Sequence, residues 1–306
     1  MNPPPPESPP AISVVIASVN GLPSIAECLD CLVQQEGNIG YEVLVMDRCD
    51  EKTRQEIRRR FLQPEIELVE VPGRPSIPKL RAMGIARARG QLIAILEDHC
   101  NVPLGWFRAI IRLHEAGYEV MSGPVENAAV DRIVDWAVFF CEYARFMAPI
   151  PGGTVDEIAG NCASYSRQVL DRVGPELREE VWEPFLHARM RELQIPFYCD
   201  PALTVAHKKE FGFWYFLSQR YHYSRSFAGM RMRTAPFWKR MAYAGGCVLL
   251  PAILFGRMTK TVFEKGRHRL KFLFAAPVIA VFLISWAWGE AVGALFGTGD
   301  SLARVE

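Results

Sequence analysis

The sequence has 306 residues, a formal net charge of +1 and 50% hydrophobic residues. That length supports one large domain or two small ones, and the near-neutral charge gives no reason to expect a nucleic-acid-binding protein. Eight scattered cysteines, most of them in apolar surroundings, favour buried reduced thiols over a disulfide framework. Cys28 and Cys31 form a CxxC in the middle of a predicted helix, a position that does not favour a redox role.

The first ten residues, MNPPPPESPP, are rich in proline. They lack the basic region and apolar stretch of a signal peptide, so we expect the globular part that follows to be cytoplasmic. Their composition predicts an extended, disordered tail.

From residue 11 to about residue 206, short apolar runs alternate with stretches of helical spacing. The runs predicted as strands are 11–18, 41–47, 66–71, 91–97 and 118–123, and those predicted as helices are 24–35, 51–62 and 78–90. This alternation predicts an α/β fold, with a mainly parallel sheet and helices on both of its faces.

Polar residues follow three of the predicted strands, in the segments SVNG (18–21), DRCD (47–50) and EDHC (97–100). In sheets of this kind ligands bind at the carboxyl ends of the strands, so these three segments together predict a site. Glu97, Asp98 and His99 offer oxygen and imidazole ligands that suit magnesium or, with the histidine, manganese. The alternative is an ordinary helix start, with acids near the positive end of the helix dipole.

The character of the chain changes after about residue 212. Residues 220–240 carry six arginines and lysines and no acid, and two uncharged stretches follow, 241–256 and 272–289. The second would span roughly 27 Å as a helix, close to the thickness of a bilayer core. Trp286 and Trp288 near its end resemble an interfacial belt. The alternative is that both stretches are helices of a soluble core.

The segment 257–271 between the two stretches has six Lys/Arg and one Glu, the excess expected of a cytoplasmic loop. The stretch 241–256 is short and contains two glycines and a proline, so we predict that it is re-entrant or interfacial. The stretch 272–289 is then predicted to cross the membrane outward, which would leave a short C-terminal tail outside.

Residues 11 to about 233 resemble the family 2 glycosyltransferases, which have a Rossmann-like GT-A fold and use nucleotide-diphosphate sugars. AISVVIASVNG is similar to that family's opening strand and turn, and EVLVMDRCD to its second strand. LRAMGIARARGQLIAILED resembles the segment ARNxG…A.G…hhhLDxD, although Ala82 stands where an Asn is usual and the DxD aligns with Glu97-Asp98-His99. The family's acceptor-side strand and helix resemble IAGNCASYSRQVLDRVG, and its segment with the catalytic base resembles REEVWEPFLHARMRELQIPFYCDP. The QxxRW element loosely resembles SQRYHYSR, which lacks the Trp.

The resemblance implies roles for individual residues. Glu183 takes the position of the catalytic base, although the acid that usually follows is replaced by Pro184. The implied acceptor-side residues are Asn161 and Trp182, and the implied metal ligands are Asp98, His99 and His207, holding manganese or magnesium. The implied contacts of the nucleotide sugar are Ala17, Ser18, Asn20, Asp47, Lys79, Arg81, Glu97 and Asp98.

Several of these residues also have a simpler structural interpretation. Glu183 could be a solvated helix-start acid like its neighbours, although an apolar setting beside Trp182 would raise its pKa and make it a better base. Trp182 and His207 could be core residues, Asp47 a turn former, and Lys79 and Arg81 residues of a surface helix. Which of Glu97, Asp98 and His99 contacts the ion is open, with Asp98 and His99 preferred.

We therefore predict a disordered tail (1–10), a GT-A catalytic domain (11–212) with a nucleotide-binding half (11–100) and an acceptor half (101–212), a basic amphipathic interface segment (213–240) and a membrane-associated region (241–306). The predicted function is inverting, metal-assisted transfer of a sugar to a lipid-linked or cell-envelope glycan acceptor, at the cytoplasmic face of the cell membrane. The EDH segment and Pro184 leave a second hypothesis, a non-catalytic nucleotide-sugar- or glycan-binding membrane protein. A nucleotidyltransferase ranks low because SVNGLPS lacks a Gly-rich phosphate loop with a nearby lysine.

Overall fold

The computed structural model describes residues 9–35, 37, 39–174 and 179–305. Most of the predicted Pro-rich tail, residues 1–8, lies outside them. The chain divides into two compact units, the first made of Met1–Pro124 and Ile150–Ala206 and the second of Val125–Pro149 and His207–Glu306. The predicted boundaries of the tail, the catalytic domain and the interface segment stay predictions.

An eight-stranded sheet forms the centre of the first unit, in the order β3-β2-β1-β4-β9-β6-β10-β8. Its strands are β1 (Ile12–Ser18), β2 (Tyr41–Asp47), β3 (Ile66–Glu70), β4 (Leu92–Glu97), β6 (Val120–Ser122), β8 (Gly153–Val155), β9 (Ser164–Ser166) and β10 (Phe197–Cys199). The first four sheet positions are mutually parallel, β9 is antiparallel to β4 and β6, and β8 is antiparallel to β10. The predicted α/β fold with a mainly parallel sheet is confirmed.

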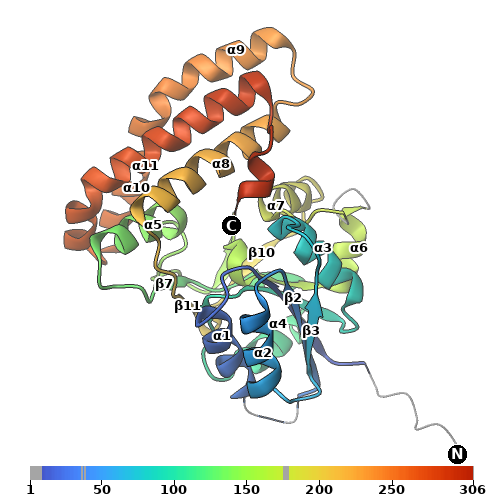
Figure 1. Ribbon diagram of the computed structural model, residues 1–306. Helices are drawn as coiled ribbons and strands as arrows, with labels where there is room; N and C mark the ends of the chain where they lie inside the picture. Colours follow the sequence, from blue (N-terminus) through green and yellow to red (C-terminus); the bar gives the residue numbers. More distant parts are fainter. Residues whose placement is uncertain (1–8, 36, 38, 175–178, 306) are drawn as a thin grey trace, which may run out of the picture. The chain divides into compact units, whose positions relative to one another are not determined.

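Helices cover both faces of this sheet (Figure 1). They are α1 (Ser24–Val33), α2 (Glu51–Arg60), α3 (Ile77–Arg87), α4 (Trp106–Glu115), α6 (Arg167–Val173) and α7 (Glu183–Glu192). On one face Val15, Leu44 and Met46 pack against Leu80 of α3. The same face continues to Ile95 and Tyr165, which share a core with residues of α6 and α7. The burial of β1 along its whole length follows from its position between two strands and two helical layers.

The second unit is mainly helical. Its elements are β7 (Val125–Asn127), α5 (Ile133–Tyr143), α8 (Phe213–Arg231), α9 (Phe237–Gly246), α10 (Leu250–Lys265), α11 (Arg269–Phe296) and a terminal 3₁₀ turn (Ser301–Arg304). The helix α11 lies alongside α8 on one side and α9–α10 on the other (Figure 1).

Two helices of this unit are long and apolar enough to cross a membrane, Phe237–Lys265 with a mean hydropathy of 1.4 and Arg269–Phe296 with 2.1. In the first, a 3₁₀ turn at Cys247–Leu249 joins α9 to α10, so the segment stays helical through the glycines and the proline that suggested an interruption. Pro251 causes no break because it lies in the first turn of α10, where the backbone N–H has no partner within the helix to lose. The re-entrant or interfacial placement of 241–256 and the crossing by 272–289 stay predictions.

Candidate active site

The ends of β1, β2 and β4 lie next to one another at one edge of the sheet. The strand register pairs Ser18 with Asp47 and Ala17 with Glu97. Residues far apart in the sequence therefore meet, as parallel strands require. The side chains at this edge form the candidate site.

Asp98, directly after β4, is buried and anchors the loop that follows β1. Its Oδ2 accepts hydrogen bonds from the backbone N–H groups of Val19 and Asn20, both at 2.8 Å, and its Oδ1 accepts one from Asn20 Nδ2 at 2.5 Å. His99 Nδ1 lies 2.9 Å from the same Oδ1. Burial raises the pKa of this carboxyl, but the hydrogen bond and charge of His99 and the two backbone amides outweigh it, so the pKa is lowered. Asp98 is therefore an ionised carboxylate whose oxygens both accept hydrogen bonds from the protein.

Glu97 and His99 flank that anchor and offer a second set of donor atoms. Glu97 Oε2 lies 3.3 Å from His99 Nε2, and the Glu97 side chain is 26% exposed. A carboxylate oxygen and an imidazole nitrogen at this separation suit a divalent cation such as manganese. The Nδ1 side of the same imidazole contacts Asp98, which orients the ring as an outer partner of a metal-bound histidine does. The chemistry of this donor set fits a metal.

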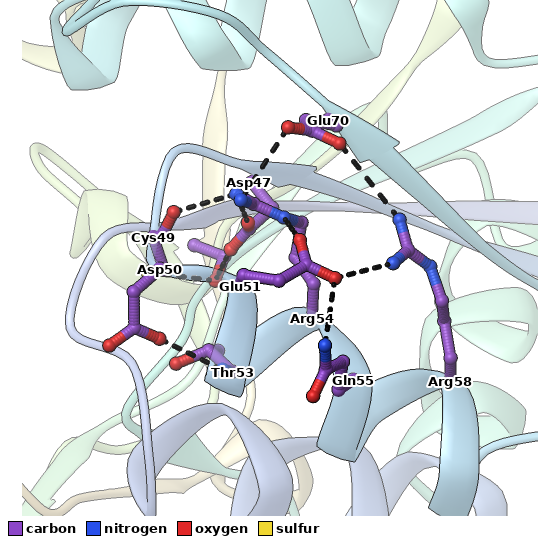
Figure 2. Close-up of polar contacts among 10 residues, drawn as sticks. Asp47, Cys49, Asp50, Glu51, Thr53, Arg54, Gln55, Arg58 and Glu70 are labelled. Carbon is purple, nitrogen blue, oxygen red and sulfur yellow. Dashed lines mark hydrogen bonds and ion pairs between the residues drawn. The ribbon is translucent and has the colours of Figure 1, made fainter.

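Asp47, at the end of β2, is fully buried and bonded on two sides. Ser18 Oγ donates to Asp47 Oδ1 at 2.7 Å, and Arg54 Nη1 of α2 lies 3.3 Å from Oδ2. Figure 2 shows that Arg54 also reaches Glu51 and, at the end of β3, Glu70. Asp47 is thus paired with an arginine at the strand edge. The sequence predicted that this carboxylate contacts the nucleotide directly.

Asp50, close behind Asp47 in the sequence, has a local role. Its carboxylate accepts a hydrogen bond from the Thr53 backbone N–H at 2.8 Å and caps α2 (Figure 2). Between the two acids, burial raises the pKa of the Cys49 thiol to about 12, with Asp47 adding to the effect, so this thiol is protonated at neutral pH.

Arg81 of α3 joins the strand edge to α7. Its guanidinium is ion-paired with Glu183, and its Nη2 lies 3.4 Å from Glu97 Oε1. The Arg81 side chain is 7% exposed, so these contacts are shielded from water. Lys79, two residues earlier on the same helix, is exposed, because residues two apart point in different directions. The structure therefore brings Arg81 into the site from the sheet side of α3 and leaves Lys79 on its outer surface.

Glu183 is the first residue of α7 and is buried, with its side chain 10% exposed. Burial raises the pKa of this carboxyl above its ordinary value, and the charge of Arg81 only partly offsets that rise. The side chain packs against Gly160, where a Cβ would lie 2.7 Å from Glu183 Cγ. The solvated helix-start interpretation does not fit these surroundings.

Asn161 and Trp182, the two predicted acceptor-side residues, are both buried. Asn161 Nδ2 donates to Cys100 Sγ at 3.5 Å, whereas its Oδ1 accepts no hydrogen bond from the described residues. A buried amide oxygen without a partner is costly unless a ligand or water supplies a donor. Trp182 instead contacts Phe185 edge-on, with ring centroids 5.7 Å apart.

His207, the third predicted metal ligand, ends the strand β11 (Val205–His207) and begins the second stretch of the second unit, His207–Glu306. It is 2% exposed, and its ring centroid lies 4.7 Å from that of Tyr143. Its assignment as a ligand stays a prediction.

The model of the family described as glycosyl transferase family 2 matches residues 13–174, which include β1, α3 and the end of β4. The chain belongs to glycosyl transferase family 2. The matched segment ends before α7, so the assignment of Glu183 rests on the geometry above and on the resemblance of its own segment.

Three known proteins resemble the chain over different lengths. The succinoglycan biosynthesis protein ExoO of Rhizobium meliloti (strain 1021) is 27% identical over 132 residues, 43% of this chain and 38% of the relative, so this family 2 chain matches well under half of that protein's length. The mannosyltransferase PcManGT of Pyrobaculum calidifontis, in complex with GDP-Man and Mn²⁺, has a TM-score of 0.57 at 16% identity, covering 93% of this chain and 88% of that one. GalNAc-T7 with UDP, GalNAc and Mn²⁺ has a TM-score of 0.52 at 14% identity, covering 66% of this chain and 44% of that one. At such identities the two structures establish the fold, which is GT-A.

Three features of the site were not predicted from the sequence. Arg54 and Glu70 extend the polar cluster at the end of β2, and Gly160 makes room for Glu183. The only signal in the sequence was the position of Glu70 at the end of a predicted strand, since the contacts of Arg54 and Gly160 depend on packing between distant segments.

Proposed function

We propose that this family 2 glycosyltransferase transfers a sugar from a nucleotide-diphosphate donor to an acceptor hydroxyl with inversion, and that Glu183 is the catalytic base. The observation that carries the proposal is the position of Glu183. It is a buried carboxylate with a raised pKa, and one arginine connects it to the end of β4. A general base of this kind is more effective when its pKa is closer to neutral pH.

In the proposed reaction the acceptor oxygen attacks the anomeric carbon while its proton passes to a Glu183 oxygen. The bond from the anomeric carbon to the diphosphate oxygen breaks on the opposite side, which inverts the configuration. Arg81 keeps Glu183 oriented and offers positive charge beside the leaving diphosphate. Asn161 Oδ1 is available to accept a hydrogen bond from a sugar hydroxyl.

On the donor side we propose that Glu97 and His99 would hold a divalent cation, which when bound would neutralise charge on the diphosphate. Asp98 fixes the backbone of Val19 and Asn20, the loop predicted to contact the nucleotide. Asp47 acts through Arg54, which it holds at the same sheet edge. These assignments keep the predicted residues but give Asp98 and Asp47 a positioning role.

We further propose that the acceptor is lipid-linked or part of a cell-envelope glycan, and that the site faces the cytoplasm at the cell membrane. Two long apolar helices in the second unit support a membrane location. The excess of positive charge in residues 257–271 supports a cytoplasmic face.

The test is a screen of the purified, detergent-solubilised chain against a panel of nucleotide sugars with manganese or magnesium, measuring diphosphate release. We expect turnover of at least one donor and a loss of about 100-fold or more in Glu183→Gln. The matched control is Glu179→Gln, an exposed acid four residues earlier, which should keep full activity. Unchanged turnover in Glu183→Gln would remove the proposed base, and donor binding without turnover in the wild type would favour the non-catalytic binding protein.

A further inference from the structure

One face of α11 carries exposed large apolar side chains along the whole helix. Each of them is at least 40% exposed, and they recur at helical spacing: Leu270, Leu273, Phe274, Val281, Ile284, Trp288 and Phe296. The opposite face is buried in the second unit: Phe272, Ala275, Ile279, Phe282, Leu283, Ala287, Gly289, Glu290, Gly293 and Ala294. The neighbouring segment 237–265 adds to the exposed surface Phe237, Trp238, Met241, Val248, Leu249, Ile253 and Phe263. We call this exposed surface the apolar face of the hairpin 237–296.

The buried face of the second half of α11 is tied to α8, a helix that begins with aromatic residues and continues with polar and basic ones. A Cβ on Gly289 would lie 2.4 Å from the Tyr221 carbonyl oxygen, and one on Gly293 would lie 2.2 Å from that of Arg225, so the two backbones touch. Ser285 Oγ donates to the Leu217 carbonyl at 2.8 Å. The helix α8 and the terminal turn packed on it carry polar and charged residues: Gln219, Arg220, His222, Arg225, Asp300 and Arg304.

The other end of the hairpin, at the turn between α10 and α11, is tied to the segment Val125–Pro149. Arg267 is ion-paired with Glu126 of β7, and the His268 ring lies 4.7 Å from the ring of Trp136 in α5. Lys265 Nζ lies 3.4 Å from the Pro149 carbonyl oxygen. The chain enters this segment from Pro124 and leaves it into Ile150, and both of those residues belong to the first unit.

If the hairpin stood perpendicular to the membrane, its contacts with α8 and its contacts with the segment Val125–Pro149 would lie on opposite sides of the bilayer. α11 has 28 residues and is about 42 Å long, so its ends would lie on opposite sides of a bilayer core. The turn between α10 and α11 would then lie on the far side of the bilayer together with the segment Val125–Pro149, although the chain connects both ends of that segment to the first unit. The arginines of α8 would be carried into hydrocarbon, where charged side chains are strongly disfavoured.

We propose that α9–α10 and α11 lie in the plane of the membrane, with the apolar face of the hairpin inserted into a single leaflet of an anionic bilayer and α8 and α5 facing water. This is the geometry of an interfacial helix, whose apolar side enters the acyl region while its polar side stays wet. Basic residues occur at both ends of the hairpin, Arg233, Lys239 and Arg240 at one and Arg267, Arg269 and Lys271 at the other. Both ends can therefore contact anionic headgroups of the same leaflet. It is an alternative to the predicted crossing by residues 272–289.

The test is the sidedness of the turn. Lys239→Cys reports on one end of the hairpin, Glu264→Cys on the turn, and Gln63→Cys on the first unit, and all three positions are exposed. Sealed vesicles containing each variant are treated with a membrane-impermeant maleimide, with the wild type as the baseline for the native cysteines. Equal labelling of all three without detergent is the expected result. Labelling of Glu264→Cys only after detergent, with the other two labelled before it, would show a spanning hairpin and overturn the proposal.

A second measurement tests the apolar face without relying on labelling. Leu273→Glu with Ile284→Glu places two charges on that face, and we expect about tenfold weaker co-sedimentation of the purified chain with vesicles of phosphatidylcholine and phosphatidylglycerol. The matched control is Leu62→Glu, the same change at an 80% exposed leucine of the first unit, which should bind like the wild type. Equal binding by the double variant, or no binding by the wild type, would contradict the proposal. Neither experiment needs catalytic activity, so a failure of the proposed reaction would leave both results interpretable.

Discussion

Gly160 lies directly against the side chain of Glu183, and a Cβ added there would be 2.7 Å from Glu183 Cγ and 2.8 Å from its Cβ. Gly160→Ala should therefore displace the buried carboxylate, while the fold is retained because the contact involves one side chain. We expect diphosphate release to fall about 10- to 100-fold, as small misplacements of catalytic groups do. Steady-state kinetics should show the loss in kcat.

The control for this variant is Gly152→Ala, where the nearest atom to the added Cβ is 3.6 Å away, an ordinary contact. It should have wild-type kinetics. Wild-type kcat in Gly160→Ala would show that the position of Glu183 is not critical.

Arg81 lowers the pKa of Glu183 against the effect of burial. In Arg81→Gln the carboxyl loses that cation, so its pKa should rise. A base is active only when deprotonated, so the acid limb of the pH–rate profile should move to higher pH. The measurement is kcat/KM across pH 5 to 9 in both enzymes, and an unmoved or lowered acid limb would argue against Glu183 as the titrating base.

Metal binding separates the roles of the three residues at the end of β4. Glu97→Gln and His99→Gln should each weaken manganese binding by about tenfold or more, because each removes a ligand or its charge. Asp98→Asn should mainly lower stability, by about 1–3 kcal/mol, because the amide cannot accept all of the hydrogen bonds that the carboxylate accepts. Free manganese measured by electron paramagnetic resonance and thermal unfolding give the two readouts.

If Asp98→Asn abolished manganese binding with an unchanged melting temperature, the ion would belong on Asp98, as the sequence first suggested. The same titration on His207→Ala tests the remaining predicted ligand.

Stability should fall at mildly acidic pH because of His187. Burial lowers the pKa of this imidazole to about 3, and its Nε2 lies 2.7 Å from the Tyr165 hydroxyl oxygen. In the unfolded chain the His187 imidazole takes up a proton near pH 6.5, whereas in the folded chain it does so only near pH 3. The contribution of the neutral imidazole to the free energy of unfolding is therefore complete above pH 6.5 and declines as the pH falls toward 3. The maximum slope is about 1.4 kcal/mol per pH unit. Denaturant unfolding at pH 7 and pH 5 should show a smaller decline in His187→Gln, and an equal decline in both proteins would contradict this assignment.

The sequence predicted the sheet and the place of the site because both depend on local patterns. The buried runs of β1, β2 and β4 have the length and apolar composition of central strands, and their polar ends fall on one edge in any parallel arrangement. The same patterns placed Glu183 at a helix start. They could not give its burial, which depends on Arg81 and Gly160.

The sequence by itself determined the family and the fold class and predicted the residues of the candidate site, because strand periodicity and the order of motifs are properties of neighbouring residues. Only the tertiary structure decided what those residues contact. Asp98 anchors the loop after β1, Asp47 holds Arg54, and Arg81 reaches Glu183, each through partners distant in the sequence. Hydropathy likewise identified the apolar helices, whereas the packing of α8 and α5 against α11 showed which of its faces stays exposed. Sequence periodicity predicts which face of a helix or strand is buried, but only the three-dimensional packing shows which residues that face contacts.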